Sequence, residues 1–251
     1  MRKISYLIVA FCLVSLPLLY GCSKAGNRND MKIQPGDRVI QFAGYEWNVR
    51  SSGALQQGPG PNNFSDGQEN VWVDDAGRLH LKITQKNGIW YCAEVTLRKV
   101  YGYGHYAIQV DSPLEGLDRN TVGSLFLYKN DSQEIDIEFS KWGIANNDNA
   151  QFVVQPGDKS GNKQRFQFAD KQSSSVHMID WQKAAVHFES YNGTIADTSE
   201  AGNHVASWIY QGEDNPSVQD MQVKLNLWLF KGMAPSDQKP QELVISGFKI
   251  F

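Results

Sequence analysis

The chain has 251 residues, a formal net charge of −3 at pH 7 and 20% charged residues. It contains no basic run or basic helix, which argues against a nucleic-acid-binding protein. Aromatic residues make up 12% of the chain, a content that suits the faces of β-sheets.

The N-terminal residues predict an export signal. Residues 1–3 are positively charged, and residues 4–19 form an apolar run that is short for a membrane span. The run ends in Leu-Tyr-Gly-Cys at residues 19–22, which resembles a bacterial lipoprotein signal, cleaved before a cysteine that is then acylated. An ordinary secretion signal and an uncleaved anchor are the alternatives. We therefore expect a signal peptide over residues 1–21 and lipidation of Cys22.

The rest of the chain is predicted to be a short tether followed by one domain. Residues 22–35 are mostly polar and lack periodicity, as in a linker, and the domain would span residues 36–251. Cys12 leaves with the signal and Cys22 carries lipid, so Cys92 has no cysteine partner and the domain depends on its own core. We expect a monomer anchored by its lipid in the bacterial cell envelope, in the outer membrane or on the cell surface.

Alternating apolar and polar residues recur along the chain, a period of two that is typical of β-strands. The clearest example is residues 221–230, where the odd-numbered positions are apolar. Turn signals such as Asn87-Gly88 and Asn192-Gly193 separate these runs. Residues 114–118 are the best candidate for a short helix. Many short strands between regular turns predict an all-β fold, a sandwich of antiparallel sheets.

Other catalytic motifs are weak or missing. Residues 102–107 fit Gly-x-Gly-x-x-Ala, but the dinucleotide motif needs a helix after the glycines, and here a strand is expected. The five histidines lack the spacing of a zinc site, and there is no Gly-x-Ser-x-Gly elbow. Hydrolysis through serine or zinc is not expected.

The most informative segment is Glu134-Ile135-Asp136-Ile137-Glu138. On a strand, the three carboxylates would share one face and the apolar residues the other. Neighbouring like charges raise the energy of ionisation, so a strand that tolerates them usually uses them, through shifted pKa values or a bound cation. We therefore predict a chemical role. A solvated acidic strand and a cation site made of three carboxylates are the alternatives.

This strand resembles the active-site strand of glycoside hydrolase family 16, the jelly-roll β-glucanases and their relatives. The resemblance covers roughly residues 40–251. It implies a concanavalin A-like jelly roll with a concave substrate cleft. The other segments that resemble the family are residues 92–94, 101–106, 122–128, 179–181, 192–193 and 225–228.

The spacing and the departures from the family pattern bear on specificity. Strict Glu-x-Asp-x-Glu alternation resembles lichenase-like and xyloglucan-active members, whereas laminarinase-like members carry an extra bulge residue. A sugar-holding arginine of lichenases is replaced by Thr96, and Arg98 is a possible substitute. The cysteine that lichenases pair with the equivalent of Cys92 is missing. Residues 246–249 lack the acid of the family's calcium site, so a structural calcium is not supported and no metal or cofactor is expected.

The resemblance also implies a mechanism. Retaining glycosidases need two carboxyls about 5–5.5 Å apart, yet Glu134 and Glu138 would have Cα atoms about 13 Å apart on a flat strand. Only a strongly curved sheet would bring the two carboxyls close enough. By resemblance, Glu134 is the nucleophile and Glu138 the acid/base, while Asp136 hydrogen-bonds the nucleophile and separates the two pKa values.

Sugars bind by stacking on aromatic rings, while polar groups contact their hydroxyls. Phe126 and Tyr128 share one strand face, and their apolar neighbours point the opposite way. The orientation of His105, beside a double-glycine turn, is left open. The expected substrate-binding residues are Glu94, Phe126, Tyr128, Trp142, Asn226 and Trp228.

The sequence therefore predicts an endo-acting, retaining glycoside hydrolase of the β-glucanase type, whose partners are a polysaccharide and a membrane. One alternative is a non-catalytic, carbohydrate-binding surface lipoprotein, because such sandwiches host lectins as readily as enzymes. Another is a transglycosylase that uses the same residues.

Overall fold

The structure is a computed structural model that describes residues 38–196, 203–217 and 220–251. The expected signal peptide, the tether and Cys22 lie outside these residues. In the described part of the chain, no helix is long and apolar enough to cross a membrane.

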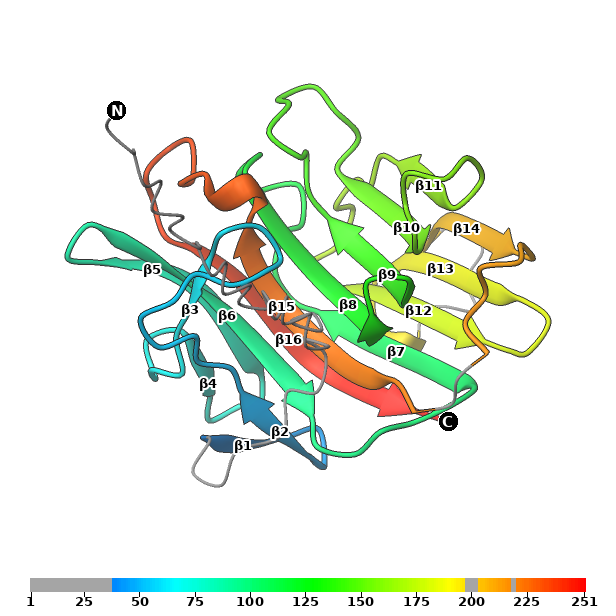
Figure 1. The fold of residues 1–251 in the computed structure, drawn as a ribbon, viewed down its shortest axis with the longest axis horizontal. Helices are drawn as coiled ribbons and strands as arrows, with labels where there is room; N and C mark the ends of the chain where they lie inside the picture. Colours follow the sequence, from blue (N-terminus) through cyan, green and yellow to red (C-terminus); the bar gives the residue numbers. More distant parts are fainter. Residues whose placement is uncertain (1–37, 197–202, 218–219) are drawn as a thin grey trace, which may run out of the picture. The chain divides into compact units, whose positions relative to one another are not determined.

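The described strands form two antiparallel layers joined by one hairpin (Figure 1). The hairpin is β5–β6, in which Thr84 pairs with Tyr91, and the two-residue β3 (Asn63–Phe64) runs parallel to β6. The first sheet has the order β11 (Lys163–Phe166), β10 (Ala150–Val154), β9 (Gln133–Phe139), β8 (Thr121–Asn130), β15 (Gln222–Leu229), β6 (Ile89–Leu97), β2 (Tyr45–Val49), β1 (Val39–Phe42). The second sheet has the order β4 (Val71–Val73), β5 (Leu79–Lys86), β16 (Gln241–Ile250), β7 (Gly104–Val110), β12 (Ser175–Trp181), β13 (Val186–Asn192), β14 (His204–Tyr210).

The hydrophobic core lies between the two sheets. The rings of Phe152 in β10 and Phe188 in β13 have centroids 5.1 Å apart. Farther along the interface, the ring of Phe139 in β9 lies 4.4 Å from that of His177 in β12. These contacts confirm the predicted β-sandwich. Because side chains alternate along each strand, the other face of the first sheet points away from the core.

Two expected elements differ from the structure. Residues 114–118 form bends and a turn instead of a helix, because five residues that include Gly116 are too few and too flexible to nucleate one. The side chain of Asp170 accepts hydrogen bonds from the backbone N–H groups of Leu114 and Glu115. The strand expected over residues 221–230 spans Gln222–Leu229, and a one-turn 3₁₀ helix, η3 (Phe230–Gly232), follows it.

Packing between the sheets gives a first prediction. Phe152→Ala should lower the free energy of unfolding by about 3–5 kcal/mol, because it leaves a cavity between the layers. The matched change at the 59% exposed Phe251 should cost about 0.5 kcal/mol or less. Urea unfolding monitored by fluorescence measures both values. Similar losses for the two variants would contradict this description of the core.

Candidate active site

The three acids of β9 lie on the face of the first sheet that points away from the core. Their apolar neighbours Ile135 and Ile137 are fully buried, which fixes the orientation of the strand. Asp136 is 3% exposed, while Glu134 and Glu138 are partly exposed. The register with β10 runs without a bulge from Ile135 to Phe139, so the strict alternation expected from the sequence is present.

Strand pairing brings most of the predicted binding residues to the same face as the acids. Tyr128 lies directly opposite Glu134, and Phe126 lies opposite Asp136. One row that crosses the sheet from β10 to β6 consists of Gln151, Glu138, Ser124, Asn226 and Glu94. A second row consists of Val153, Asp136, Phe126, Lys224 and Thr96.

Glu138 is held by residues that the sequence analysis did not identify. Gln151 donates from Nε2 to Glu138 Oε2 at 2.5 Å, and Arg165 Nε donates to Gln151 Oε1 at 3.1 Å. The guanidinium of Arg165 also lies 4.2 Å from the ring centre of Trp142. The predicted residue Trp142 is thus linked to Glu138 through two side chains. The only signal in the sequence for Gln151 and Arg165 was the alternation of side chains along β10 and β11, which places both on the face of the acids.

Asp136 is oriented by Gln155, the residue that follows β10. Gln155 Nε2 donates to Asp136 Oδ2 at 3.1 Å. The backbone N–H of Gly157 donates to Gln155 Oε1 at 2.6 Å, and because an N–H can only donate, this contact fixes which end of the amide faces Asp136. Asp136 also shares a hydrogen bond with Glu134.

All three carboxyls have raised pKa values. Burial raises the pKa of Glu134 to about 8, with a further rise from the charges of Glu138 and Asp131, whereas the hydrogen bond from Asp136 and the charge of Lys224 oppose the rise. Burial and the two neighbouring glutamates raise the pKa of Asp136 well above its ordinary value.

Burial also raises the pKa of Glu138, against the opposing effects of Gln151, Lys163 and Arg165. Because the three carboxyls are close neighbours, the protonation of each affects the other two, and they form a coupled set. The hydrogen bond between Asp136 and Glu134 raises the pKa of Asp136 and lowers that of Glu134.

Glu94 is buried between two cations. It is 1% exposed, and its carboxylate lies 2.9 Å from Arg50 Nη1 and 3.3 Å from Lys224 Nζ. Burial favours the neutral acid, but Lys224 and Arg50 hold the pKa of Glu94 below its ordinary value. Asn226 Nδ2 also donates to it at 3.4 Å.

The suggestion that Arg98 replaces a missing sugar-binding arginine stays a prediction. Arg98 lies one residue past the end of β6, where its backbone N–H donates to Glu46 of β2 and its side chain forms an exposed pair with Glu46 at 3.1 Å. The arginine beside Glu94 is Arg50, which directly follows β2. Its position depends on the pairing of β2 with β6, which the sequence alone did not reveal.

A family model described as "Glycosyl hydrolases family 16" matches residues 61–242. The chain belongs to glycosyl hydrolase family 16. No curated protein sequence matches it significantly.

Solved structures with similar folds include glucanases. A Bacillus licheniformis β-glucanase has a TM-score of 0.60 and 19% identity, over 86% of this chain and 98% of that one. A β-1,3-glucanase from Mycobacterium marinum has a TM-score of 0.60 and 16% identity, over 82% of this chain and 90% of that one. A Mycobacterium tuberculosis antigen described as a pseudo-β-1,3-glucanase has a TM-score of 0.61 and 17% identity, over 82% of this chain and 90% of that one. At these identities the likeness supports the jelly-roll fold alone.

Trp228 and His105 lie in different sheets of this family-16 domain. Trp228 follows Asn226 on the same face of β15, opposite Val122 of β8, and it packs partly against the core. His105, whose orientation was left open, belongs to β7 of the second sheet and stacks on Phe251 with ring centroids 5.3 Å apart. His105 is therefore not on the acidic face.

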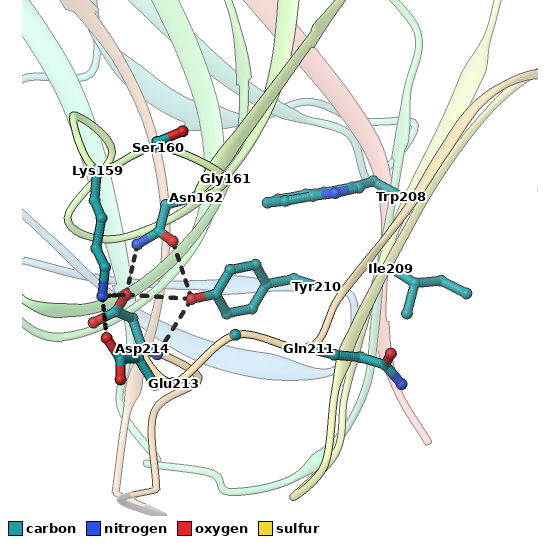
Figure 2. A pocket seen from close by; sticks show the side chains of 11 residues that line it. Lys159, Ser160, Gly161, Asn162, Trp208, Ile209, Tyr210, Gln211, Glu213 and Asp214 are labelled. Carbon is teal, nitrogen blue, oxygen red and sulfur yellow. Dashed lines mark hydrogen bonds and ion pairs between the residues drawn. The ribbon is translucent and has the colours of Figure 1, made fainter.

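A cavity of about 280 Å³ lies where the β10–β11 loop meets residues 208–214, and none of the three acids lines it. Figure 2 shows Lys159, Asn162, Tyr210 and Asp214 pointing toward one another. Asp214 accepts hydrogen bonds from Lys159 at 2.7 Å and from Asn162 at 2.9 Å. These contacts fasten the loop that begins at Gln155. Within the described ranges, no three His, Cys, Asp or Glu side chains are grouped to hold a metal ion.

The raised pKa of Glu134 predicts a pH-dependent stability effect. The folded state binds this proton more tightly than the unfolded chain does, so the stabilisation is complete below pH 4.5 and is lost as the pH rises through about 8. Glu134→Gln should therefore raise the free energy of unfolding at pH 8.5 by about 1–3 kcal/mol, with little difference below pH 4.5.

Urea unfolding across this pH range measures the effect. The exposed Glu69 is the matched control, and Glu69→Gln should change stability by about 0.5 kcal/mol or less at each pH. A Glu134→Gln variant that is less stable than the wild type at alkaline pH would contradict the assignment.

Proposed function

We propose that this family-16 protein is an endo-acting glycoside hydrolase that cleaves β-linked glucan-type polysaccharide with retention of configuration. The observation that carries the proposal is the coupled set of three carboxyls on the outer face of β9. Buried like charges are costly, and pKa values shifted in this way are typical of catalytic acids and nucleophiles. Family membership and the glucanase structures supply independent support for a glycosidase.

The proposed roles follow from the order of the three carboxyls along β9 and from the hydrogen bond between Asp136 and Glu134. Asp136 keeps a proton and donates a hydrogen bond to Glu134, which spreads the negative charge of Glu134 while leaving it a nucleophile. Glu138 protonates the glycosidic oxygen as Glu134 attacks the anomeric carbon, which breaks the glycosidic bond and forms a glycosyl ester. Glu138 then takes a proton from water as that water attacks the anomeric carbon and releases Glu134. The curvature of β9 must bring the two glutamates within reach of one sugar.

The proposed substrate path runs across the strands, over the acids. Tyr128 opposite Glu134 and Trp142 beyond Glu138 offer aromatic surfaces on the two sides of the cleaved bond. Glu94 and Asn226 are each 1% exposed, so they would act from beneath the sugar-binding surface, where Glu94 holds Arg50 and Lys224 in place. Trp228 and the nearly buried Phe126 complete the apolar part of the surface. Strict alternation in β9 favours β-1,3-1,4-glucan or xyloglucan as the substrate.

A non-catalytic carbohydrate-binding protein is the second candidate, and one of the structural neighbours is described as a pseudo-glucanase. A lectin gains nothing from three neighbouring acids whose pKa values are raised, so the site favours the enzyme. A transglycosylase would use the same residues and transfer the glycosyl unit to a second sugar.

The proposal is tested with the purified domain and a panel of β-glucans, xyloglucan, agars and carrageenans. The wild type should release new reducing ends or shift the product sizes on at least one polymer. Glu138→Gln should lower the rate by about 10²–10⁴-fold because proton transfer is lost, and Glu134→Gln by at least as much. Glu69→Gln should match the wild type.

Two outcomes would overturn parts of this account. Retained polysaccharide binding without any product would favour the lectin candidate. Cleavage that is unaffected by Glu134→Gln would place the active site elsewhere. Transglycosylation would appear as products longer than the added oligosaccharides.

We also propose that Cys22 carries a lipid that anchors the domain to a bacterial membrane, on the support of its signal-like sequence. In a bacterial host, the full-length protein should label with radioactive palmitate and sediment with membranes. Cys22→Ser should lose the label and leave the lipid-anchored membrane fraction. Equal labelling of both proteins would contradict the proposal.

A further inference from the structure

Lys224 is a buried cation on the face that carries the acids. Its side chain is 6% exposed, and it lies in the same cross-strand row as Asp136. Lysine is almost never so buried without a partner. Its partner is Glu94, at 3.3 Å from Nζ to Oε1.

Glu94 does not neutralise Lys224 completely, because it is shared with Arg50. The Arg50 guanidinium is the nearer cation, at 2.9 Å from the same carboxylate. Two cations on one carboxylate leave a surplus positive charge in a partly dry part of the sheet, where charges act over longer distances than in water.

The surplus positive charge lies on the side of the sheet that faces Glu134. The Lys224 ammonium lies 5.0 Å from the ring centre of Tyr128, and Tyr128 is the direct strand neighbour of Glu134. The ammonium also lies 5.9 Å from the ring centre of Phe126, the neighbour of Asp136. Lys224 thus faces the acids across one strand, with aromatic rings between them.

The charges around the two glutamates differ. Glu134 experiences the negative charges of Glu138 and Asp131, and Lys224 is the cation that lowers its pKa. Lys163 and Arg165, on the opposite side of β9, are the cations that lower the pKa of Glu138. Each glutamate has its own source of positive potential.

We propose that Lys224 is a positioning residue that favours the ionised, nucleophilic form of Glu134, and that the Glu94–Arg50 pair sets how much of the positive charge of Lys224 acts on Glu134. This inference rests on the proposed role of Glu134. Under this proposal Lys224 of β15 influences the reaction through its charge, without contact with the reacting atoms.

The test is an NMR titration of the Glu134 carboxyl in protein labelled with ¹³C at glutamate, with the resonance assigned by its loss in Glu134→Gln. Lys224→Met keeps the side-chain length and removes the charge, and it should raise the pKa of Glu134 by about one pH unit. Lys224→Arg keeps the charge and should restore the wild-type value. The Glu138 resonance should move much less.

Glu94→Gln provides a second variant with the opposite sign. It leaves Lys224 less neutralised, so the pKa of Glu134 should fall. A shift in the same direction for Lys224→Met and Glu94→Gln would indicate a general disturbance of the sheet and overturn the inference. An unchanged Glu134 titration in Lys224→Met would do the same.

Kinetics separate this role from sugar binding. On a cleaved polysaccharide, Lys224→Met should lower kcat near neutral pH and move the limb of the pH profile that reports Glu134 ionisation to higher pH, with little change in KM. A higher KM with an unshifted profile would instead make Lys224 a sugar-binding residue. If no polysaccharide is cleaved, the proposed function fails, while the titration still decides whether Lys224 controls the charge of Glu134.

Discussion

The constraint on which the rest of the site depends is the crowding of three carboxyls on one face of a single strand. Ile135 and Ile137 are fully buried on the opposite face, so Glu134, Asp136 and Glu138 cannot turn away from one another. Three neighbouring negative charges in a partly dry site are too costly to persist near neutral pH. The domain responds by raising the pKa values of the three acids and by placing hydrogen-bond donors and cations around the two glutamates.

The neighbouring strands supply these partners in an ordered way. β10 and the residue after it provide Gln151 and Gln155, whose amides donate to Glu138 and Asp136. On the other side, β15 provides Lys224, and β6 provides Glu94, which limits that charge. The stability lost by burying acids at this face is offset by the apolar layer between the sheets. A rigid sandwich that carries a site on its outer surface is expected to separate the two roles in this way, with stability from the core and positioning from the outer face.

Local patterns in the sequence were enough to predict the strands and which side chains share a face, because alternation depends only on neighbouring residues. Phe126, Tyr128 and Asn226 therefore lie beside the acids. The partners of Glu94 were not predictable, since Arg50 and Lys224 are 44 and 130 residues away in the chain and meet it only through strand register. The helix expected over residues 114–118 is absent for a local reason, because a five-residue segment that includes Gly116 is too short and too flexible to nucleate one.

The central claim is that Glu134 is the residue that bonds to the sugar. The most direct measurement is peptide mapping by mass spectrometry after incubation with an activated 2-deoxy-2-fluoro β-gluco-oligosaccharide, which slows release of the covalent intermediate of a retaining enzyme. The account predicts one added glycosyl unit on the peptide that contains Glu134, and none in Glu134→Gln. A glycosyl unit on Glu138 or Asp136, or steady release of the leaving group without any labelled peptide, would contradict it.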